Sequence, residues 1–515
     1  MEWGGGLGWN RTIIAGFGNL YTIRCTTRPD VSRGSGRKST ATRADDQLLR
    51  RKSVLKVRFK FLRMLPSPKL IFPALAALLI TIASCVFVQQ RYTYLPPGPY
   101  RGVLELEYNP IVPNPKGEPL PEKVDLEFDE VTEGVLPFNF DVVYEDDTTF
   151  HLVLHNGEEE ILVPATDIHA GRDQSIGRDT IRIDFPVYDT HISAYHEENV
   201  IEGVWVVHYR DNYSIPFKAY FGKGHRFTAL NKEPAADLTG TWAVDFAGSG
   251  LDDSFPGVAE LQQDGNELRG TIRTETGDYR YLEGTVQENK MYLSVFDGSH
   301  AFLFEAMLRE DGTLTGTFRS GRHYITDWTA RRDDQAELTS PDELTRLREE
   351  TPLAFAFPTV DGDTVRLSDY AGPKLVQLFG TWCPNCRDET NFLQQYLTEN
   401  ETGDLQVIAL AFEQYGADDE RSREAIRRYQ RSMNIDWPVL LAGSNDKAEA
   451  GRALPMLNKV ISYPTLLFVD RDNRVRRIHT GFNGPATSKY AEFAASFDET
   501  VQDLLATGDV AKSDQ

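Results

Sequence analysis

A Cys-Pro-Asn-Cys motif at residues 383–386 limits the folds open to this chain more than any other pattern in it. Residues 375–379 form an apolar run typical of a buried strand, and the residues from the motif to about 399 predict a helix. A CxxC motif between a buried strand and a helix is typical of thiol–disulfide redox domains. We therefore predict an α/β domain with a redox-active disulfide between Cys383 and Cys386.

The position of the motif also explains how its first cysteine becomes reactive. The thiolate is the nucleophile, so Cys383 needs a pKa below the value of about 8.5 for a free thiol. The free N–H groups and the positive dipole end of a helix N-terminus favour that anion. Pro384 suits an early helical position because its missing N–H has no helical partner there. We expect Arg387 to add positive potential and Cys386, one turn further on, to resolve a mixed disulfide on Cys383.

The pattern around the motif predicts one α/β domain over residues 351–508. The other elements that we expect in it are a hairpin at 354–357 and 364–367, strands at 405–412, 437–441, 465–469 and 475–479, and helices at 418–433, 448–454 and 487–505. Pro464 stands directly before the strand at 465–469. A proline at that position suits a cis peptide bond, with an ordinary trans turn as the alternative.

A second feature is an uncharged apolar run of 19 residues, 70–88, which follows a basic stretch. A positive flank before such a run predicts export with the N-terminus left inside. The run is just long enough for an uncleaved membrane anchor. Its residues 82–85, Ile-Ala-Ser-Cys, resemble the lipobox of bacterial lipoproteins, and we favour this interpretation. We therefore expect translation from Met64, a lipid on Cys85, and a membrane-anchored protein of the cell envelope that faces the periplasm.

The cysteine count agrees with an exported redox protein. If Cys85 carries lipid and Cys25 is never made, the CxxC pair holds the only free thiols. A zinc site would need a second pair of Cys or His ligands, so we expect neither a metal nor another cofactor. A peroxiredoxin would need the pattern PxxxTxxC, but Val376 and Gly380 stand at the Pro and Thr positions before Cys383.

The middle of the chain predicts an all-β antiparallel region that is duplicated. Alternating strands separated by turns recur before and after residue 236, and windows 179–219 and 289–330 resemble each other in spacing. His191 then meets His300, and Gly203 meets Gly316. Each unit is expected to be a small barrel or sandwich, or half of one. The expected organisation is an over-extended or disordered N-terminus (1–63), a lipoprotein signal (64–85), a linker (86–100), β-rich units (101–231 and 236–332), a linker (333–350) and the α/β domain (351–508).

Two functions of the β region remain open from the sequence. Nine of the ten His lie there, but their spacing gives no compact ligand set, so we favour scattered histidines over a metal site. Trp205, Trp242, Tyr209 and Tyr292 could form a platform for a glycan or peptide, but aromatic residues in strands are more often core.

The net charge argues against nucleic acid as a partner. It is −22 for the whole chain, and the residues after 84 carry 73 acidic against 40 basic side chains. Such a surface repels phosphate backbones.

Residues 351–508, about 30% of the chain, resemble the TlpA/ResA-type thiol–disulfide oxidoreductases of bacterial envelopes. The matching stretches are FPTVDGDTVRLSDYAG, LFGTWCPNC and YPTLLFVDRDNRVRRIHTGF. The resemblance implies a thioredoxin-like fold and a membrane-tethered protein that reduces disulfides of exported proteins, such as apocytochrome c. It also implies a membrane electron donor that recharges the dithiol. The β-rich region lies outside the resemblance.

The family roles carry over to four residues of this sequence. Cys383 is the implied nucleophile, Cys386 the resolving thiol and Pro464 the cis-proline whose loop pairs with substrate. Glu413, after the strand at 405–412, is the implied proton acceptor. One residue departs from the thioredoxin pattern: Gln377 stands where a buried Asp is expected, so the proton of the resolving thiol must pass to Glu413 or to water.

The sequence therefore predicts an envelope-anchored protein-disulfide reductase whose β region holds or spaces the substrate. Two alternatives stay open. The CxxC motif alone does not exclude an oxidant or isomerase. The second alternative is a ligand-binding lipoprotein in which the redox domain has a secondary role.

Overall fold

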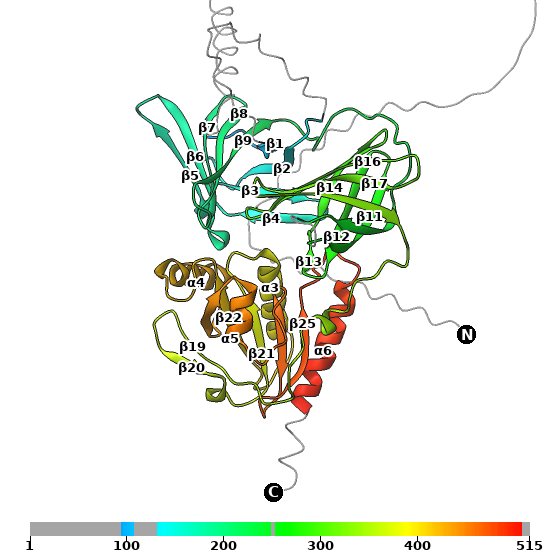
Figure 1. The fold of residues 1–515 in the computed structure, drawn as a ribbon. Coiled ribbons are helices and arrows are strands. Elements are labelled where there is room, and N and C mark those ends of the chain that lie inside the picture. Colours follow the sequence, from blue (N-terminus) through cyan, green and yellow to red (C-terminus); the bar gives the residue numbers. More distant parts are fainter. Residues whose placement is uncertain (1–93, 108–130, 249–252, 507–515) are drawn as a thin grey trace, which may run out of the picture. The chain divides into compact units, whose positions relative to one another are not determined.

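The computed structural model describes residues 94–107, 131–248 and 253–506 (Figure 1). They form two all-β units followed by an α/β domain. The predicted signal segment, with Met64 and Cys85, lies outside the described residues. Within the described ranges, no helix is both long and apolar enough to span a membrane.

The first β unit is an antiparallel meander that forms a half-barrel. Its first strand pairs with both the second and the last, which places β4 and β5 at the two open edges of the sheet. Buried side chains alternate along its strands, as in the pattern BiBiBiB of β3. Its strands are β1 (Gly98–Glu105), β2 (Val135–Tyr144), β3 (Phe150–Asn156), β4 (Glu159–Val163), β5 (Ile168–Asp173), β6 (Arg178–Phe185), β7 (Thr190–Glu197), β8 (Val200–Val207) and β9 (Tyr213–Phe221).

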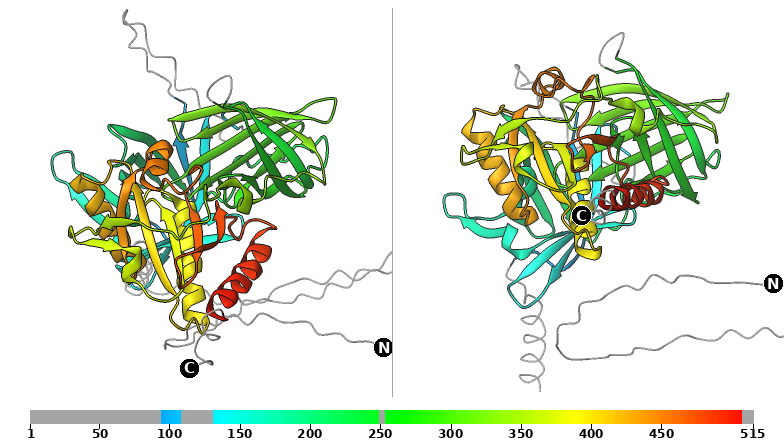
Figure 2. Two further views of the ribbon diagram at one scale, coloured as in Figure 1. Left: turned by 60° about the horizontal axis from the view of Figure 1, so that its bottom comes forward. Right: turned by 90° about the horizontal axis from the view of Figure 1, so that it is seen from below.

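The second β unit is a closed antiparallel barrel of eight strands with one short additional strand, β13. Closure comes from pairing of β11 with β12 and of β10 with β18. Figures 1 and 2 show these strands in green, wrapped around a common core. Its strands are β10 (Gly240–Phe246), β11 (Phe255–Asp264), β12 (Glu267–Thr274), β13 (Gly277–Asp278), β14 (Leu282–Gln287), β15 (Lys290–Phe296), β16 (Ala301–Leu308), β17 (Leu314–Ser320) and β18 (Tyr324–Arg332).

The two β units share features that agree with the expected duplication. In each, the first strand pairs with the last, and the penultimate strand carries one of the two glycines matched in the sequence. A Cβ on Gly203 would lie 2.1 Å from the Ser193 carbonyl oxygen, and a Cβ on Gly316 would lie 2.0 Å from that of Glu305. Both glycines therefore allow the same close approach of a neighbouring strand. The units differ in closure, because only the second is a complete barrel.

The α/β domain is built on a five-stranded sheet of order β23-β22-β21-β24-β25. Strands β21, β22 and β23 are parallel to one another, and β24 and β25 run antiparallel. A small hairpin of β19 (Ala356–Pro358) and β20 (Thr364–Arg366) precedes it. The sheet strands are β21 (Lys374–Phe379), β22 (Gln406–Glu413), β23 (Val439–Ser444), β24 (Thr465–Val469) and β25 (Val475–Thr480), and the helices are α2 (Pro341–Leu344), α3 (Pro384–Glu399), α4 (Glu420–Met433), α5 (Lys447–Ala453) and α6 (Tyr490–Ala506).

Helix α3 is held in place by contacts with its neighbouring helices α6 and α4. Phe392 of α3 packs edge-on against Phe497 of α6, with ring centroids 4.9 Å apart. Tyr429 of α4 packs against Phe379 at the end of β21 and donates a hydrogen bond to the Thr390 hydroxyl of α3, at 3.1 Å. These contacts fix the N-terminus of α3 directly after β21, where the CxxC motif begins.

Candidate active site

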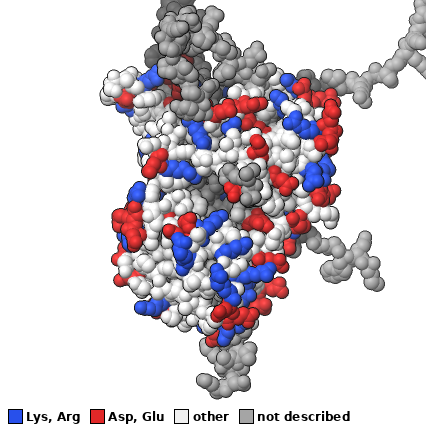
Figure 3. Space-filling model, in the orientation of Figure 1, with Lys and Arg blue, Asp and Glu red and all other residues white. Residues whose placement is uncertain are grey.

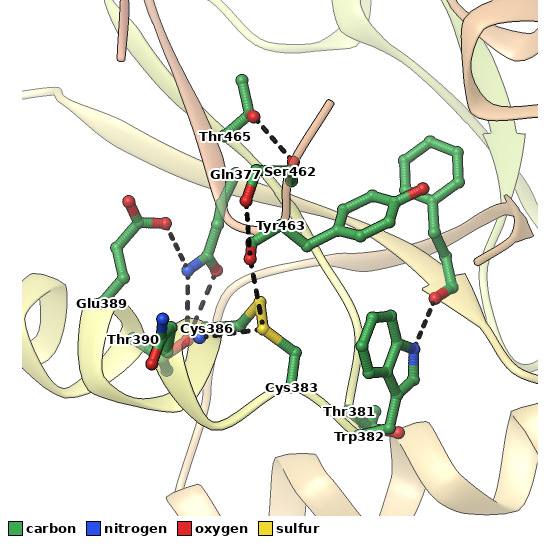
Figure 4. The surroundings of a disulfide bond; sticks show 12 residues. Gln377, Thr381, Trp382, Cys383, Cys386, Glu389, Thr390, Ser462, Tyr463 and Thr465 are labelled. Atoms are coloured by element: carbon green, nitrogen blue, oxygen red, sulfur yellow. Dashed lines mark hydrogen bonds between the residues drawn. A yellow bond between two sulfur atoms is a disulfide. The ribbon is translucent and has the colours of Figure 1, made fainter. Parts of the chain in front are cut away.

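The two cysteines of the motif form a disulfide bond at the N-terminus of α3 (Figure 4). Cys383 is the N-cap residue, Pro384 is the first helical residue, and the Cys386 N–H donates to the Cys383 sulfur at 3.2 Å. This backbone donor points at the sulfur that would carry negative charge after reduction. Cys386 is fully buried, whereas Cys383 is 5% exposed and lines a pocket. Of the two sulfurs, that of Cys383 is therefore the one that a substrate can reach.

The turn between β21 and α3 folds back on itself before it reaches Cys383. The Trp382 ring N–H donates to the Phe412 carbonyl oxygen of β22 at 3.0 Å. A Cβ on Gly380 would lie 2.3 Å from that ring nitrogen, so a glycine is required where the ring passes. The ring also packs edge-on against Tyr463, with centroids 5.9 Å apart.

The loop before β24 lies against the disulfide from the other side. The Tyr463–Pro464 peptide bond is cis. The Tyr463 carbonyl oxygen lies 3.5 Å from the Cys383 sulfur, and the Thr465 hydroxyl donates to the Ser462 carbonyl oxygen at 2.9 Å. The structure thus brings Pro464 and the CxxC motif together, as the sequence predicted.

Glu413, the predicted proton acceptor, ends β22 and is buried. Its two carboxylate oxygens accept hydrogen bonds from the Thr381 N–H at 2.9 Å and from the Thr381 hydroxyl at 2.8 Å. Burial raises the pKa of Glu413 to about 7, against the opposing effect of the Thr381 bonds. The carboxyl group therefore holds the turn that precedes Cys383, and its role as a proton acceptor remains a prediction.

A second buried carboxyl group, Glu389, was not predicted from the sequence. It lies on α3, one turn after Cys386, and has no exposed surface. The Gln377 side-chain amide donates to one of its oxygens at 2.9 Å and to the Thr390 hydroxyl at 3.3 Å. Burial raises the pKa of Glu389 to about 8. Figure 4 shows Gln377 between Glu389 and the disulfide, so a neutral amide on β21 faces a carboxyl group on the helix.

Helical spacing could have revealed Glu389. Cys386, Thr390 and Leu393 are buried on one face of α3, and position 389 falls on that same face. A glutamate on the apolar face of a helix, three residues after a cysteine, is unusual enough to mark a buried ionisable group. Glu413, the carboxyl group expected from the sequence, stands at a strand end instead.

The Arg387 side chain contacts the first β unit and not the Cys383 sulfur. Its guanidinium donates to the Tyr188 hydroxyl of the first β unit at 2.9 Å and lies 5.2 Å from the centre of that ring. These contacts give no support to the expectation that Arg387 acts on Cys383. They show instead that the first turn of α3 is anchored in the β region.

A pocket of about 390 Å³ opens in front of Cys383. One wall comes from the α/β domain, including Trp382, Cys383 and Tyr463, and the others come from both β units. The side-chain hydroxyl of Ser462 donates to the Thr276 carbonyl oxygen of the second β unit at 2.9 Å. The β region is therefore part of the surroundings of the redox site, which could not be predicted from the sequence.

The described residues do not form the aromatic platform as a set. Trp242 and Tyr292 are 2% and 5% exposed and form core, whereas Trp205, 2% exposed, and Tyr209 line the pocket in front of Cys383. His191 lies 2.8 Å from His208, ring nitrogen to ring nitrogen. In residues 94–107, 131–248 and 253–506, no three His, Cys, Asp or Glu side chains are grouped to hold a metal ion.

Comparison with known proteins gives matches to the redox domain. The model of the AhpC/TSA family matches residues 349–478. The thiol-disulfide oxidoreductase ResA of Bacillus cereus is 22% identical over 137 residues, which are 26% of this chain and 70% of ResA. ResA of Bacillus thuringiensis subsp. konkukian is 22% identical over 135 residues, 26% of this chain and 69% of that protein. A solved thiol:disulfide interchange protein of the thioredoxin family from Chlorobium tepidum is 21% identical and covers 30% of this chain and 97% of its own, with a TM-score of 0.22.

Proposed function

Because the C-terminal domain is a thioredoxin-like domain of the thiol–disulfide oxidoreductase type, we propose that this protein reduces disulfides of exported proteins at the cell envelope. The observation that carries the proposal is the Cys383–Cys386 disulfide at the N-terminus of α3, with Cys383 alone of the pair facing a pocket. Unfolded exported proteins such as apocytochrome c are the proposed substrates. A membrane dithiol donor is proposed to return the protein to its reduced form.

The chemistry follows from the positions of the two sulfurs. The Cys383 thiolate attacks one sulfur of the substrate disulfide, and the other substrate sulfur leaves as a thiolate with the electron pair of the broken bond. Cys386, buried behind Cys383, then attacks the Cys383 sulfur of the mixed disulfide and releases the second substrate thiol. Two electrons pass to the substrate, and the Cys383–Cys386 disulfide remains.

The direct contacts of the Cys383 sulfur bear on the direction of electron transfer. An oxidant needs a strongly stabilised thiolate in its reduced form. Here the sulfur has one backbone donor, the Cys386 N–H, and no side chain among the described residues donates to it, since Arg387 is engaged by Tyr188. We therefore expect the reduced pair to give up electrons readily.

The reduction potential tests this direction. The full chain in detergent is equilibrated with dithiol redox buffers, and the peptide that contains both cysteines is quantified by alkylation and mass spectrometry. We expect a potential near that of thioredoxin, about −270 mV, whereas a value near about −120 mV would identify an oxidant. Cys383→Ser should abolish reduction of a disulfide substrate, and Cys386→Ser should trap the mixed disulfide on Cys383. If the Cys383→Ser variant instead accumulated a mixed disulfide on Cys386, the assigned order of the two thiols would be wrong.

Anchoring is proposed from the sequence alone, through a lipid on Cys85 after cleavage of the signal that begins at Met64. Mass spectrometry of the mature N-terminus tests it. A mature chain that begins with acylated Cys85 is the expected result. A chain that retains residue 64 or residue 1 would contradict lipidation and leave residues 70–88 as an uncleaved anchor.

A further inference from the structure

We propose that the pocket in front of Cys383 selects disulfides carried by short acidic peptide segments, and that Arg210 and Lys447 determine this specificity. The inference rests on the proposed thiol–disulfide exchange at Cys383 and adds the class of substrate. It follows from the charge, the aromatic lining and the limited size of the pocket.

The charge of the pocket is opposite to that of the chain. Its lining includes Arg210 and Lys447, and no Asp or Glu is among the lining residues. The chain as a whole has a net charge of −22, and acidic and basic side chains are interspersed on the face drawn in Figure 3. A pocket that holds two cations and no carboxylate therefore favours an anionic ligand over a neutral or cationic one.

Neither cation is neutralised by a neighbour. Among the described residues, no carboxylate lies within ion-pair distance of Arg210 or Lys447. The Arg210 guanidinium instead lies 5.8 Å from the ring centres of both Tyr209 and Tyr213. A guanidinium supported by aromatic rings keeps its N–H donors available, and their planar arrangement suits a carboxylate.

His323 does not supply the positive charge of the pocket. His323 lines the same pocket and its ring lies 3.2 Å from the Tyr213 hydroxyl, nitrogen to oxygen. Burial, followed by the charges of Arg210 and His300, lowers the pKa of His323 to about 4, so the ring is neutral at pH 7. Arg210 and Lys447 are the Arg and Lys side chains that line this pocket.

The size of the pocket limits what can reach Cys383. Its volume of about 390 Å³ suits a few residues of an extended segment. The second β unit closes one side, because a Cβ on Gly277 of β13 would lie 2.0 Å from the Asn385 side-chain nitrogen within the CxxC motif. The Asn385 amide also lies 3.4 Å from the Asp278 carbonyl oxygen. A folded domain could not approach Cys383 past this contact, whereas an extended segment could enter.

The test is a single-turnover reaction, which needs no electron donor. The full-length protein is reduced, freed of reductant and mixed with the symmetric disulfide of acetyl-Gly-Glu-Cys-Glu-Gly-amide. Matched peptides carry Gln or Lys in place of both Glu. Each second-order rate constant is divided by that of dithiothreitol with the same peptide, which removes differences in intrinsic reactivity. We expect the Glu peptide to react at least about 5-fold faster than the Gln peptide, as one partly exposed ion pair would allow, and the Lys peptide to react slowest.

The matched variants assign the preference to the two cations. Arg210→Gln and Lys447→Gln should each reduce the Glu-to-Gln ratio toward 1. Arg178→Gln and Lys459→Gln serve as controls: Arg178 also lies over a tyrosine ring of the first β unit, 6.0 Å from its centre, and Lys459 is an exposed lysine of the α/β domain. Both controls should keep the wild-type ratio. Thermal unfolding and alkylation of both cysteines verify that each variant is folded and fully reduced.

The outcomes separate the inference from the proposed function. Equal normalised rates for the Glu and Gln peptides, or an unchanged ratio in both pocket variants, would overturn the specificity and leave the exchange reaction intact. Reaction with the folded disulfide protein insulin, but with none of the peptides, would also overturn it. Failure to react with insulin and with every peptide would contradict the proposed function itself.

Discussion

Glu389 shows how one side chain acquires properties from burial that its sequence position alone does not give. The carboxyl group is fully buried on α3, and its single hydrogen-bond donor among the described residues is the Gln377 amide. With a pKa raised to about 8, it remains protonated in the folded protein at neutral pH. Cys386 lies one helical turn before it, so Glu389 is the nearest buried group on the same helix that can hold or release a proton.

The raised pKa of Glu389 predicts that the protein loses stability as the pH rises. In the unfolded chain the Glu389 carboxyl ionises near about pH 4.3. Between that pH and about 8 the folded state binds one proton more than the unfolded state, so the free energy of unfolding falls as the pH rises. Glu389→Gln removes this loss. The variant should therefore gain stability relative to the wild type from pH 5 to pH 8, by up to about 1.4 kcal/mol per pH unit and a few kcal/mol in total.

Urea unfolding is measured at pH 5, 6.5 and 8 through the hydrogen exchange of α3. This readout gives the difference in the free energy of unfolding between variant and wild type for the α/β domain alone. Glu399→Gln is the matched control, because Glu399 is exposed at the end of the same helix. Its difference from the wild type should not change with pH. A pH-independent difference for Glu389→Gln would show that the buried carboxyl group is not held protonated.

Single elements were predictable where local pattern and local chemistry agree. Helix α3 ends at Glu399 and β24 spans Thr465–Val469, as the sequence predicted. For α3, Pro384 and the cysteine cap mark the start, and the apolar face continues for four turns. For β24, an unbroken apolar run after Pro464 is typical of a buried central strand.

The β units were less predictable at this scale. Strands β4 and β5 hold at most one buried side chain each, and burial does not alternate along β14, so local patterns mark these strands weakly. Closure of the second unit depends on the pairing of β11 with β12 around the turn at Gly265, combined with the pairing of β10 with β18. The alternation along each strand is the same in an open and a closed sheet, so the sequence could not separate a barrel from a sandwich.

At the scale of the whole molecule, one buried arginine joins the three structural parts. Arg280, in the loop after β13, is 5% exposed and forms ion pairs with Glu159 of β4, Asp388 of α3 and, at 3.3 Å, Asp297. Its carboxylate partners therefore come from the first β unit, the second β unit and the redox helix. Asp388 is two residues after Cys386, so this junction fixes the β region against the active site.

Arg280→Met should be strongly destabilising, because it leaves three carboxylates without their cation in a buried site. The expected loss is about 3–5 kcal/mol in the free energy of unfolding. Arg269→Met is the matched control: Arg269 is exposed on β12 and pairs with Glu267 at 3.4 Å, so its loss should be within about 1 kcal/mol.

Thermal and urea unfolding of the two variants test this prediction. Adding Asp388→Asn to Arg280→Met should restore part of the lost stability, since it removes one of the uncompensated charges. Equal effects of Arg280→Met and Arg269→Met would contradict a stabilising junction at Arg280.

Local patterns in the sequence predict the redox domain. A strand, a CxxC motif, a helix and a later proline are local patterns, and their chemistry depends on backbone geometry that nearby residues specify. The sequence therefore identified Cys383 and Cys386, and its resemblance to a known family implied that Pro464 lies beside them. The surroundings of the disulfide depend on how the whole molecule packs. The burial of Glu389, the contact of Glu413 with Thr381, and the arrival of Arg210 and Arg280 from separate β units depend on packing between residues far apart in the chain. No local pattern encodes those contacts, because each side chain acquires its pKa and its partners only when the domains enclose it.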